Sequence, residues 1–199
     1  MRSVKTFLKA VAGMAAIFLM WSVLGIQRGM AQSSIPCLPD CFNDQWSSLS
    51  SIECTLDSCG LTLRIYYRSR HACNQWFDYY LEKVDILGGS YDACLQYYGG
   101  LKELLQAITE CLLKANPAGF PPDKPGDCAD NWRVMKGPCW YRNGNTLEPC
   151  AYERCCIDRY TVCLDPQTGE QIVADWEPID AGICDVMPAP GAQCEVVCD

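Results

Sequence analysis

The chain has a single histidine, His71, and lacks the short motifs that mark most enzymes and metal proteins. With one imidazole, the chain has one conventional general base. Most histidine-containing metal sites use several histidines, so such sites are disfavoured. No G-x-S-x-G sequence is present to hold a nucleophilic serine on a strained turn. We interpret His71 as an exposed turn residue. We therefore name no catalytic residue, metal ligand or cofactor, and the sequence favours a protein that is not an enzyme.

The sequence also contains no C-x2-C pair. Structural zinc sites and thiol–disulfide oxidoreductases are built on such pairs, so both classes are disfavoured. The twelve residues that begin at Asp165 do not match a calcium-binding loop. Such a loop has glycine at its sixth position and glutamate at its twelfth, whereas here glycine is fifth and tryptophan is twelfth. No N-x-S/T glycosylation sequence occurs, which agrees with a bacterial source.

Positive charge is scarce, and none follows Arg159. The net charge is −8. Residues 1–31 hold four of the sixteen basic residues and no acid, so the remainder carries 12 basic residues and 24 acids, or −12. Such a chain repels phosphate backbones, and we expect no nucleic-acid partner.

The N-terminal segment has the three-part layout of a secretory signal peptide. Three basic residues precede the apolar stretch 11–26, and small residues lie before the expected cleavage after Ala31. Sixteen apolar residues are fewer than the about 20 that span a bilayer. We therefore predict a secreted, periplasmic or cell-surface protein of a bacterium, without stable membrane insertion after cleavage.

All sixteen cysteines lie after residue 31. An even and high count in an exported chain predicts a disulfide scaffold with up to eight bridges, although the pairing cannot be read from the sequence. The expected disulfide-forming residues are Cys37, Cys41, Cys54, Cys59, Cys73, Cys94, Cys111, Cys128, Cys139, Cys150, Cys155, Cys156, Cys163, Cys184, Cys194 and Cys198.

The Pro- and Gly-rich segment 117–127 divides the chain into two expected lobes, 32–116 and 128–199. Seven cysteines precede this linker and nine follow it. Both counts are odd, so complete pairing within one molecule requires at least one bridge that crosses the linker.

Hydrophobic periodicity predicts a small α+β protein, disulfide-rich, with β-hairpins in both halves. Residues 61–68 alternate as a half-buried strand, and we favour a returning strand over 76–87, although helical spacing also fits there. Residues 101–115 predict one amphipathic helix, ended by Pro117. Residues 156–164 and 171–174 predict a second hairpin, with disulfide-pinned loops beyond Trp176.

Two features suggest a binding surface. One is a basic and aromatic stripe on one strand face, joined by an aromatic residue of the next strand: Arg64, Tyr66, Arg68, Arg70 and Trp76. The other is a concentration of tyrosines, seven of the ten lying between residues 66 and 98. Such groups bind anionic polymers, sugars or protein partners. The arginines can equally pair with the protein's own acids, and the tyrosines can fill its core.

These observations favour a non-catalytic structural or binding protein of the adhesion, matrix or surface kind. Its partner would be an unknown protein or a polysaccharide surface. Two alternatives stay open. A small secreted hydrolase would need only two carboxylates, and the 24 acids prevent a choice among them. A disulfide-locked inhibitor or toxin would present a loop such as 137–149.

Overall fold

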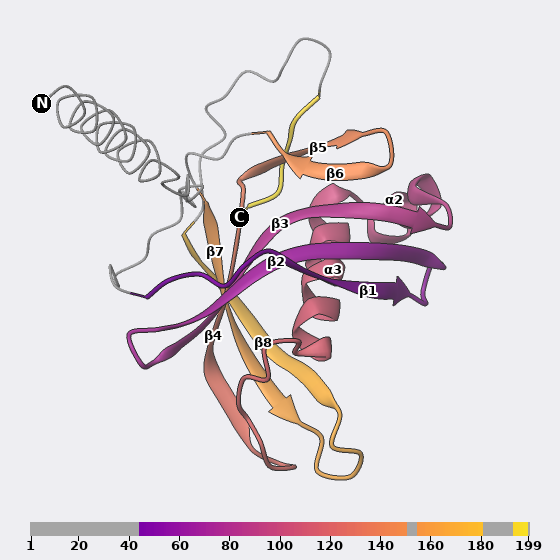
Figure 1. The fold of residues 1–199 in the computed structure, drawn as a ribbon. Helices are drawn as coiled ribbons and strands as arrows, with labels where there is room; N and C mark the ends of the chain where they lie inside the picture. Colours follow the sequence, from indigo (N-terminus) through magenta and orange to yellow (C-terminus); the bar gives the residue numbers. More distant parts are fainter. Residues whose placement is uncertain (1–43, 151–154, 181–192, 199) are drawn as a thin grey trace, which may run out of the picture. The chain divides into compact units, whose positions relative to one another are not determined.

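The computed structural model describes residues 44–150, 155–180 and 193–198, which lie within one compact unit, Ile35–Asp199. The predicted signal peptide, residues 1–31, lies outside the described residues. The described part is mostly β-sheet with two helices (Figure 1). In chain order the elements are β1 (Ser50–Leu56), β2 (Leu61–Ala72), β3 (Trp76–Gly88), α2 (Tyr91–Tyr98), α3 (Leu101–Ala115), β4 (Cys128–Lys136), β5 (Cys139–Asn143), β6 (Thr146–Pro149), β7 (Cys156–Leu164), β8 (Gln171–Asp180) and β9 (Glu195–Val196).

All nine described strands belong to one sheet, which is organised around β3. One edge of β3 pairs with β2, which in turn pairs with β1. The other edge pairs first with β4, in parallel, and then with β6. From β4 the sheet continues through β7 to β8, and from β6 through β5 to β9. The sheet therefore runs without interruption from one expected lobe into the other.

The hairpin of β2 and β3 confirms the strand interpretation of both segments. The first half of β2 alternates as expected, with Leu61, Leu63, Ile65 and Tyr67 buried. In the second half of β2 the buried residues are Arg70 and Ala72, and the register shift between Tyr66 and Tyr67 places its extra residue, Glu82, on β3. The Trp46 ring lies 4.5 Å from the Arg70 guanidinium and covers the second face of the sheet there, so the alternation of buried and exposed residues does not extend along the whole strand.

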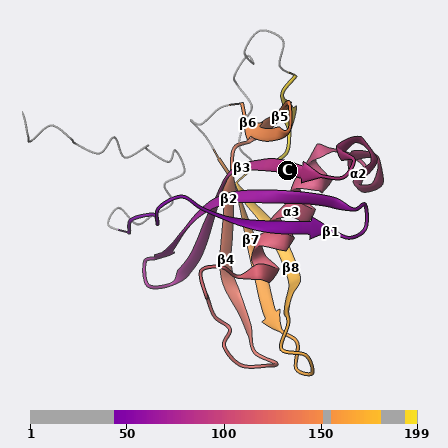
Figure 2. The ribbon, with the colours of Figure 1, turned by 45° about the vertical axis from the view of Figure 1, so that its right-hand side comes forward.

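The helix predicted over residues 101–115 is present as α3 with the same bounds. It lies across one face of the sheet and reaches from β1 to β8 (Figures 1 and 2). Its apolar side is fully buried in the main core at Leu104, Leu105, Ile108 and Leu112. Asn116 ends the helix in the left-handed conformation, and its N–H donates to the carbonyls of Leu112 and Leu113.

A second helix, α2, corrects the expectation of one helix. Its eight residues are rich in tyrosine and give a weak amphipathic pattern, which explains why it was missed. Local capping defines it clearly: the Ser90 hydroxyl accepts from the N–H of Ala93, and Gly99 ends the helix at φ 90°.

The C-terminal half is also more strand-rich than predicted. The strand over 156–164 is confirmed as β7, but its partner β8 continues to Asp180, so the expected loop beyond Trp176 is wrong for residues 177–180. The strand β4 was not predicted, because its second half is buried on both faces and does not alternate. In the linker, Phe120 packs against the main core and the carbonyl of Pro121 accepts from the Trp132 indole at 2.7 Å.

The thirteen cysteines in the described ranges are all disulfide-bonded. Five bridges join described pairs, and none of these five crosses residues 117–127, so the crossing bridge stays a prediction. The density of bridges fits a disulfide-stabilised extracellular or exported protein. The five disulfide pairs are Cys54–Cys111, Cys59–Cys94, Cys128–Cys163, Cys150–Cys194 and Cys156–Cys198.

Neither described helix combines the length and hydropathy needed to cross a bilayer.

Candidate functional site

A row of charged residues crosses five neighbouring strands on the sheet face opposite α3. Each member is the register partner of the next, so the row follows the strand order from β2 to β8. Its members are Arg70, Asp78, Arg133, Arg159 and Glu177. The row includes one residue of the predicted arginine stripe and joins it to acids of the same chain.

The first half of this row is buried. Asp78 is inaccessible to solvent and accepts one hydrogen bond from Arg70, at 2.9 Å, and two from Arg133, at 2.7 and 2.9 Å. One carboxylate therefore serves two guanidinium groups. Aromatic faces cover both cations: Trp46 lies 4.5 Å from Arg70 and Trp76 lies 4.4 Å from Arg133.

The second half of the row is open to solvent. Arg159 pairs with Asp130 and Glu177, each at 3.1 Å, and its guanidinium lies 5.9 Å from the Trp76 ring. The carboxylate partners are largely exposed, so these ion pairs contribute little to stability.

The other predicted binding residues also have partners within the chain. Arg64 pairs with Glu53 at 2.7 Å, and this hydrogen bond raises the pKa of the Arg64 guanidinium. Arg68 pairs with Glu82 at 3.3 Å, and Lys83 lies 4.3 Å from the Tyr66 ring. The five predicted residues are thus engaged by neighbouring side chains, and their role in binding stays a prediction.

The tyrosine concentration divides between core and surface. Tyr67, Tyr79 and Tyr91 belong to the main core, and Tyr80 belongs to a smaller cluster with Met135 on the opposite face. In contrast, 62% of Tyr97 is exposed. Most of the seven tyrosines therefore fill the interior.

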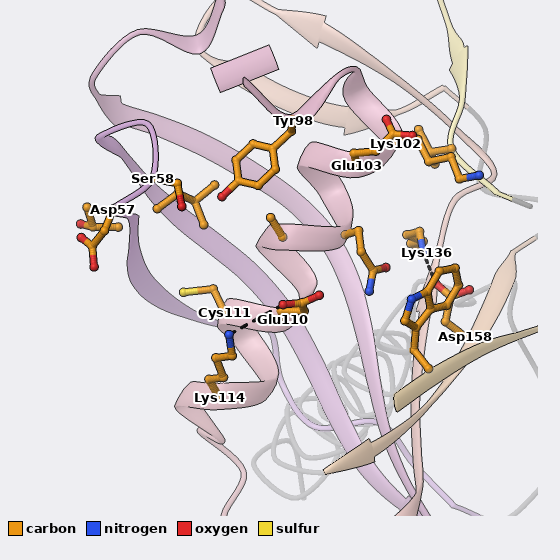
Figure 3. A pocket seen from close by; sticks show the side chains of 16 residues that line it. Asp57, Ser58, Tyr98, Lys102, Glu103, Glu110, Cys111, Lys114, Lys136 and Asp158 are labelled. Carbon is orange, nitrogen blue, oxygen red and sulfur yellow. Dashed lines mark hydrogen bonds and ion pairs between the residues drawn. The ribbon is translucent and has the colours of Figure 1, made fainter. Parts of the chain in front are cut away.

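A second candidate surface, which the sequence did not reveal, is a groove of about 810 Å³ that passes over the outer face of α3 (Figure 3). Asp57 and Ser58, from the β1–β2 turn, lie on one side of the helix, and Lys136 and Asp158, from β4 and β7, lie on the other (Figure 3). The complete lining is Thr55, Leu56, Asp57, Ser58, Tyr98, Lys102, Glu103, Gln106, Ala107, Glu110, Cys111, Lys114, Lys136, Asp158, Trp176 and Val197.

The floor of the groove on the β7 side is polar and nearly buried. Lys136 and Asp158 form an ion pair in which 4% and 6% of the side chains are exposed. Beside them, the Gln106 carbonyl oxygen accepts from the Tyr160 hydroxyl at 3.1 Å. Burial, and then the negative charge of Asp158, raises the pKa of Tyr160, so this hydroxyl stays a donor. The Gln106 amide nitrogen is buried without a hydrogen-bond partner among the described residues.

The rim of the groove carries aromatic and charged side chains. Trp176 on β8 is 38% exposed and lies opposite Tyr160 in the sheet register. Along α3, Glu110 and Lys114 pair at 3.7 Å across one helical turn. The lining holds three lysines and four carboxylates, so the groove has little net charge.

Disulfides fix the groove walls. The turn residues 55–58 lie between Cys54, which is bonded to α3 through Cys111, and Cys59, which is bonded to α2 through Cys94. On the opposite side, Val197 precedes Cys198, which is bonded to Cys156 at the start of β7. Each wall is therefore held by a covalent link within a few residues of the lining.

His71 is exposed, as expected, but it lies on β2 instead of in a turn, and its ring stacks on Phe77 with 4.9 Å between ring centres. Within the described ranges, no group of three or more histidines, cysteines or acids is placed to hold a metal ion. The segment 137–149, expected as a presented loop, largely forms the β5–β6 hairpin, with Trp140 and Leu147 fully buried.

The groove was missed because its residues are distant in sequence. Lys136 and Asp158 are 22 positions apart, and Gln106 lies on another element. Gln106 gave no signal in the sequence, because it lies off the apolar face predicted for the helix. Comparison of the chain with protein-family models, curated proteins and solved structures found no significant match in any of the three.

Proposed function

We propose that this chain is an exported, disulfide-stabilised, non-catalytic binding protein of the adhesion, matrix or surface kind, and that the groove over α3 is its binding surface. The observation that carries the proposal is the covalent fixing of the groove walls, through Cys54–Cys111 and Cys59–Cys94 on one side and Cys156–Cys198 on the other.

A pre-formed groove favours binding because less conformational freedom is lost when the ligand arrives. Bridges at both ends of residues 55–58 oppose a closing motion of this wall. Such motions exclude water and assemble the catalytic groups in many enzymes. A static and open groove therefore fits recognition better than turnover.

The groove carboxylates support the same conclusion. Asp158 is occupied by Lys136, and Glu110 is occupied by Lys114. A glycosidase requires one carboxylic acid and one carboxylate at a set separation around the scissile bond. Asp158 and Glu110 are thus both engaged by lysines of the same chain, which suits a hydrogen-bonding surface.

Two assays on the purified mature protein test the proposal. In the first, fluorescently labelled protein is sedimented with intact bacterial cells and with immobilised protein or polysaccharide surfaces, and saturable binding is expected. In the second, the protein is incubated with a broad panel of ester, peptide and glycoside substrates, and no turnover is expected. Turnover that disappears in Asp158→Asn or Glu110→Gln would replace this proposal with the hydrolase alternative.

A control variant makes the binding assay specific. Ile172→Ala changes an exposed residue of β8 outside the groove lining and should bind as the parent does. Mass spectrometry of the exported protein tests the predicted cleavage after Ala31 in the same preparation. Absence of binding to every surface, together with absence of turnover, would contradict the proposed function.

A further inference from the structure

We infer that the groove over α3 binds a segment of a neutral polysaccharide, with Trp176 as the stacking platform and the Lys136–Asp158 pair as the polar floor. This inference rests on the proposed function and names the class of its ligand. It depends on the chemistry of the groove lining, on its charge balance and on the nature of the neighbouring sheet edge.

The floor offers both hydrogen-bond donors and acceptors within a short distance. The Lys136 ammonium is donor-only, the Asp158 carboxylate is acceptor-only, and they are already in contact. A sugar hydroxyl donates and accepts at the same time, so one hydroxyl can bridge such a pair without breaking it. Gln106 extends the polar floor along α3: its carbonyl oxygen accepts from the Tyr160 hydroxyl, and its amide nitrogen has no hydrogen-bond partner among the described residues.

Trp176 supplies the apolar contact that such a floor lacks. Its ring is partly exposed at the edge of the groove, and its main chain is held on β8 opposite Tyr160. The main-chain N–H of Trp176 donates to the Asp175 carboxylate at 2.9 Å. An indole on a fixed strand provides a large and rigid amphipathic face at low entropic cost, which suits the apolar face of a sugar ring.

The charge balance separates this ligand from charged alternatives. Three lysines and four acids line the groove, so neither an anionic polymer nor a polycation meets a complementary field. The volume of about 810 Å³ lies within the range of about 300–1,000 Å³ that is typical of small-molecule sites. The open form of the groove fits a segment within a chain of sugars.

An extended peptide on the free edge of β8 is the main competing occupant of this region. β8 is an edge strand with exposed apolar residues. However, its register shifts near Val173 and Asp180, and Pro178 lies within it. Bulges and proline are the features that protect sheet edges from strand addition. The groove beside β8 is therefore the better binding surface.

Affinity electrophoresis tests the inference. The mature protein is run through native gels that contain a soluble neutral polymer (β-glucan, xylan, mannan or dextran) and through gels that contain heparin or polygalacturonate. We expect retardation by at least one neutral polymer, with little change between low and high salt. Trp176→Ala should weaken that binding at least tenfold, and Trp176→Phe should restore part of it.

Ile172→Ala is the matched control on the same strand, and Glu110→Gln tests the helix side of the groove while keeping the side-chain shape. Equal affinity of Trp176→Ala and the parent protein, or retardation by no neutral polymer, would overturn the inference. Retardation by heparin alone, lost at high salt, would also overturn it and would favour the arginines of β2. If cell or protein surfaces are bound equally by the parent and Trp176→Ala, the proposed function stands and only the sugar inference fails.

Discussion

Arg133 and Asp78 face each other across the parallel pair of β4 and β3, and the Arg133 guanidinium donates to both carboxylate oxygens of Asp78. The same carboxylate accepts from Arg70 on β2. One buried acid therefore links strands from the two halves of the chain and is the shared counter-ion of two buried cations.

The substitution Asp78→Asn should destabilise the protein by about 3–5 kcal/mol, because it leaves Arg70 and Arg133 charged and buried without a counter-ion. Chemical denaturation measures this change in the free energy of unfolding. Glu53→Gln is the matched control, since it breaks the exposed pair with Arg64 and should lower the free energy of unfolding far less. Similar effects of both variants would show that the charged row does not stabilise the fold.

Removal of one groove bridge should lower the stability of the protein. Cys54 and Cys111 are 57 positions apart. Closing a loop of that length in the unfolded chain corresponds to about 4 kcal/mol, so Cys54→Ser with Cys111→Ser should lose a comparable amount. The measurement is the denaturation midpoint under non-reducing conditions. An unchanged melting temperature in this variant, or in the parent under strong reductant, would contradict the view that disulfides hold the fold.

Alkaline pH should destabilise the protein through two buried tyrosines. Burial raises the pKa of Tyr79 and of Tyr160 above the ordinary value of 10.0. A raised folded-state pKa means that this stabilisation is complete below pH 10 and is lost as the pH rises beyond it. Thermal unfolding followed between about pH 8 and pH 12 should show the decline, and tyrosinate absorbance should mark the unfolding. Tyr160→Phe should decline less steeply, and an equal slope would exclude Tyr160 as a contributor.

Two neighbouring glycines after β3 should respond differently to alanine. Gly89 has φ 90°, and a Cβ there would overlap the carbonyl oxygen of Gly60 and approach the Leu61 Cα at 2.9 Å. Gly89→Ala should therefore cost at least about 2 kcal/mol, from backbone strain and this contact. A Cβ at Gly88 meets nothing within 4 Å, so Gly88→Ala is the control. Denaturation curves compare the two, and equal stability would contradict the close approach of the β1–β2 turn.

The local sequence pattern predicted the elements that bury one side and leave the other side more exposed. The alternating start of β2 and the apolar stripe of α3 have one buried side each, so their periodicity survives in the sequence. The second half of β4 is buried on both sides and has no such pattern. Tyr91 to Tyr98 form a helix with only two buried residues, which leaves little periodic signal.

The candidate site depends on register, and register is not a local property. Lys136 meets Asp158 only because β4 pairs with β7, and Gln106 reaches Tyr160 only because α3 crosses the sheet. Likewise, Arg70 was predicted to share a face with Arg64 and Arg68. Arg70 is buried, however, because the Trp46 ring covers its guanidinium and Asp78, its register partner on β3, accepts from it.

The central position of β3 has a consequence for the order of assembly. In a chain exported from its N-terminus, both bridges of the first half, Cys54–Cys111 and Cys59–Cys94, can close before residue 128 reaches the oxidising compartment. One edge of β3 then has unpaired main-chain groups at residues 77–80 and 84–85 until β4 and β6 pair with it. Unpaired strand edges of this kind promote aggregation. The incomplete sheet is thus the stage of folding at which aggregation is most favoured.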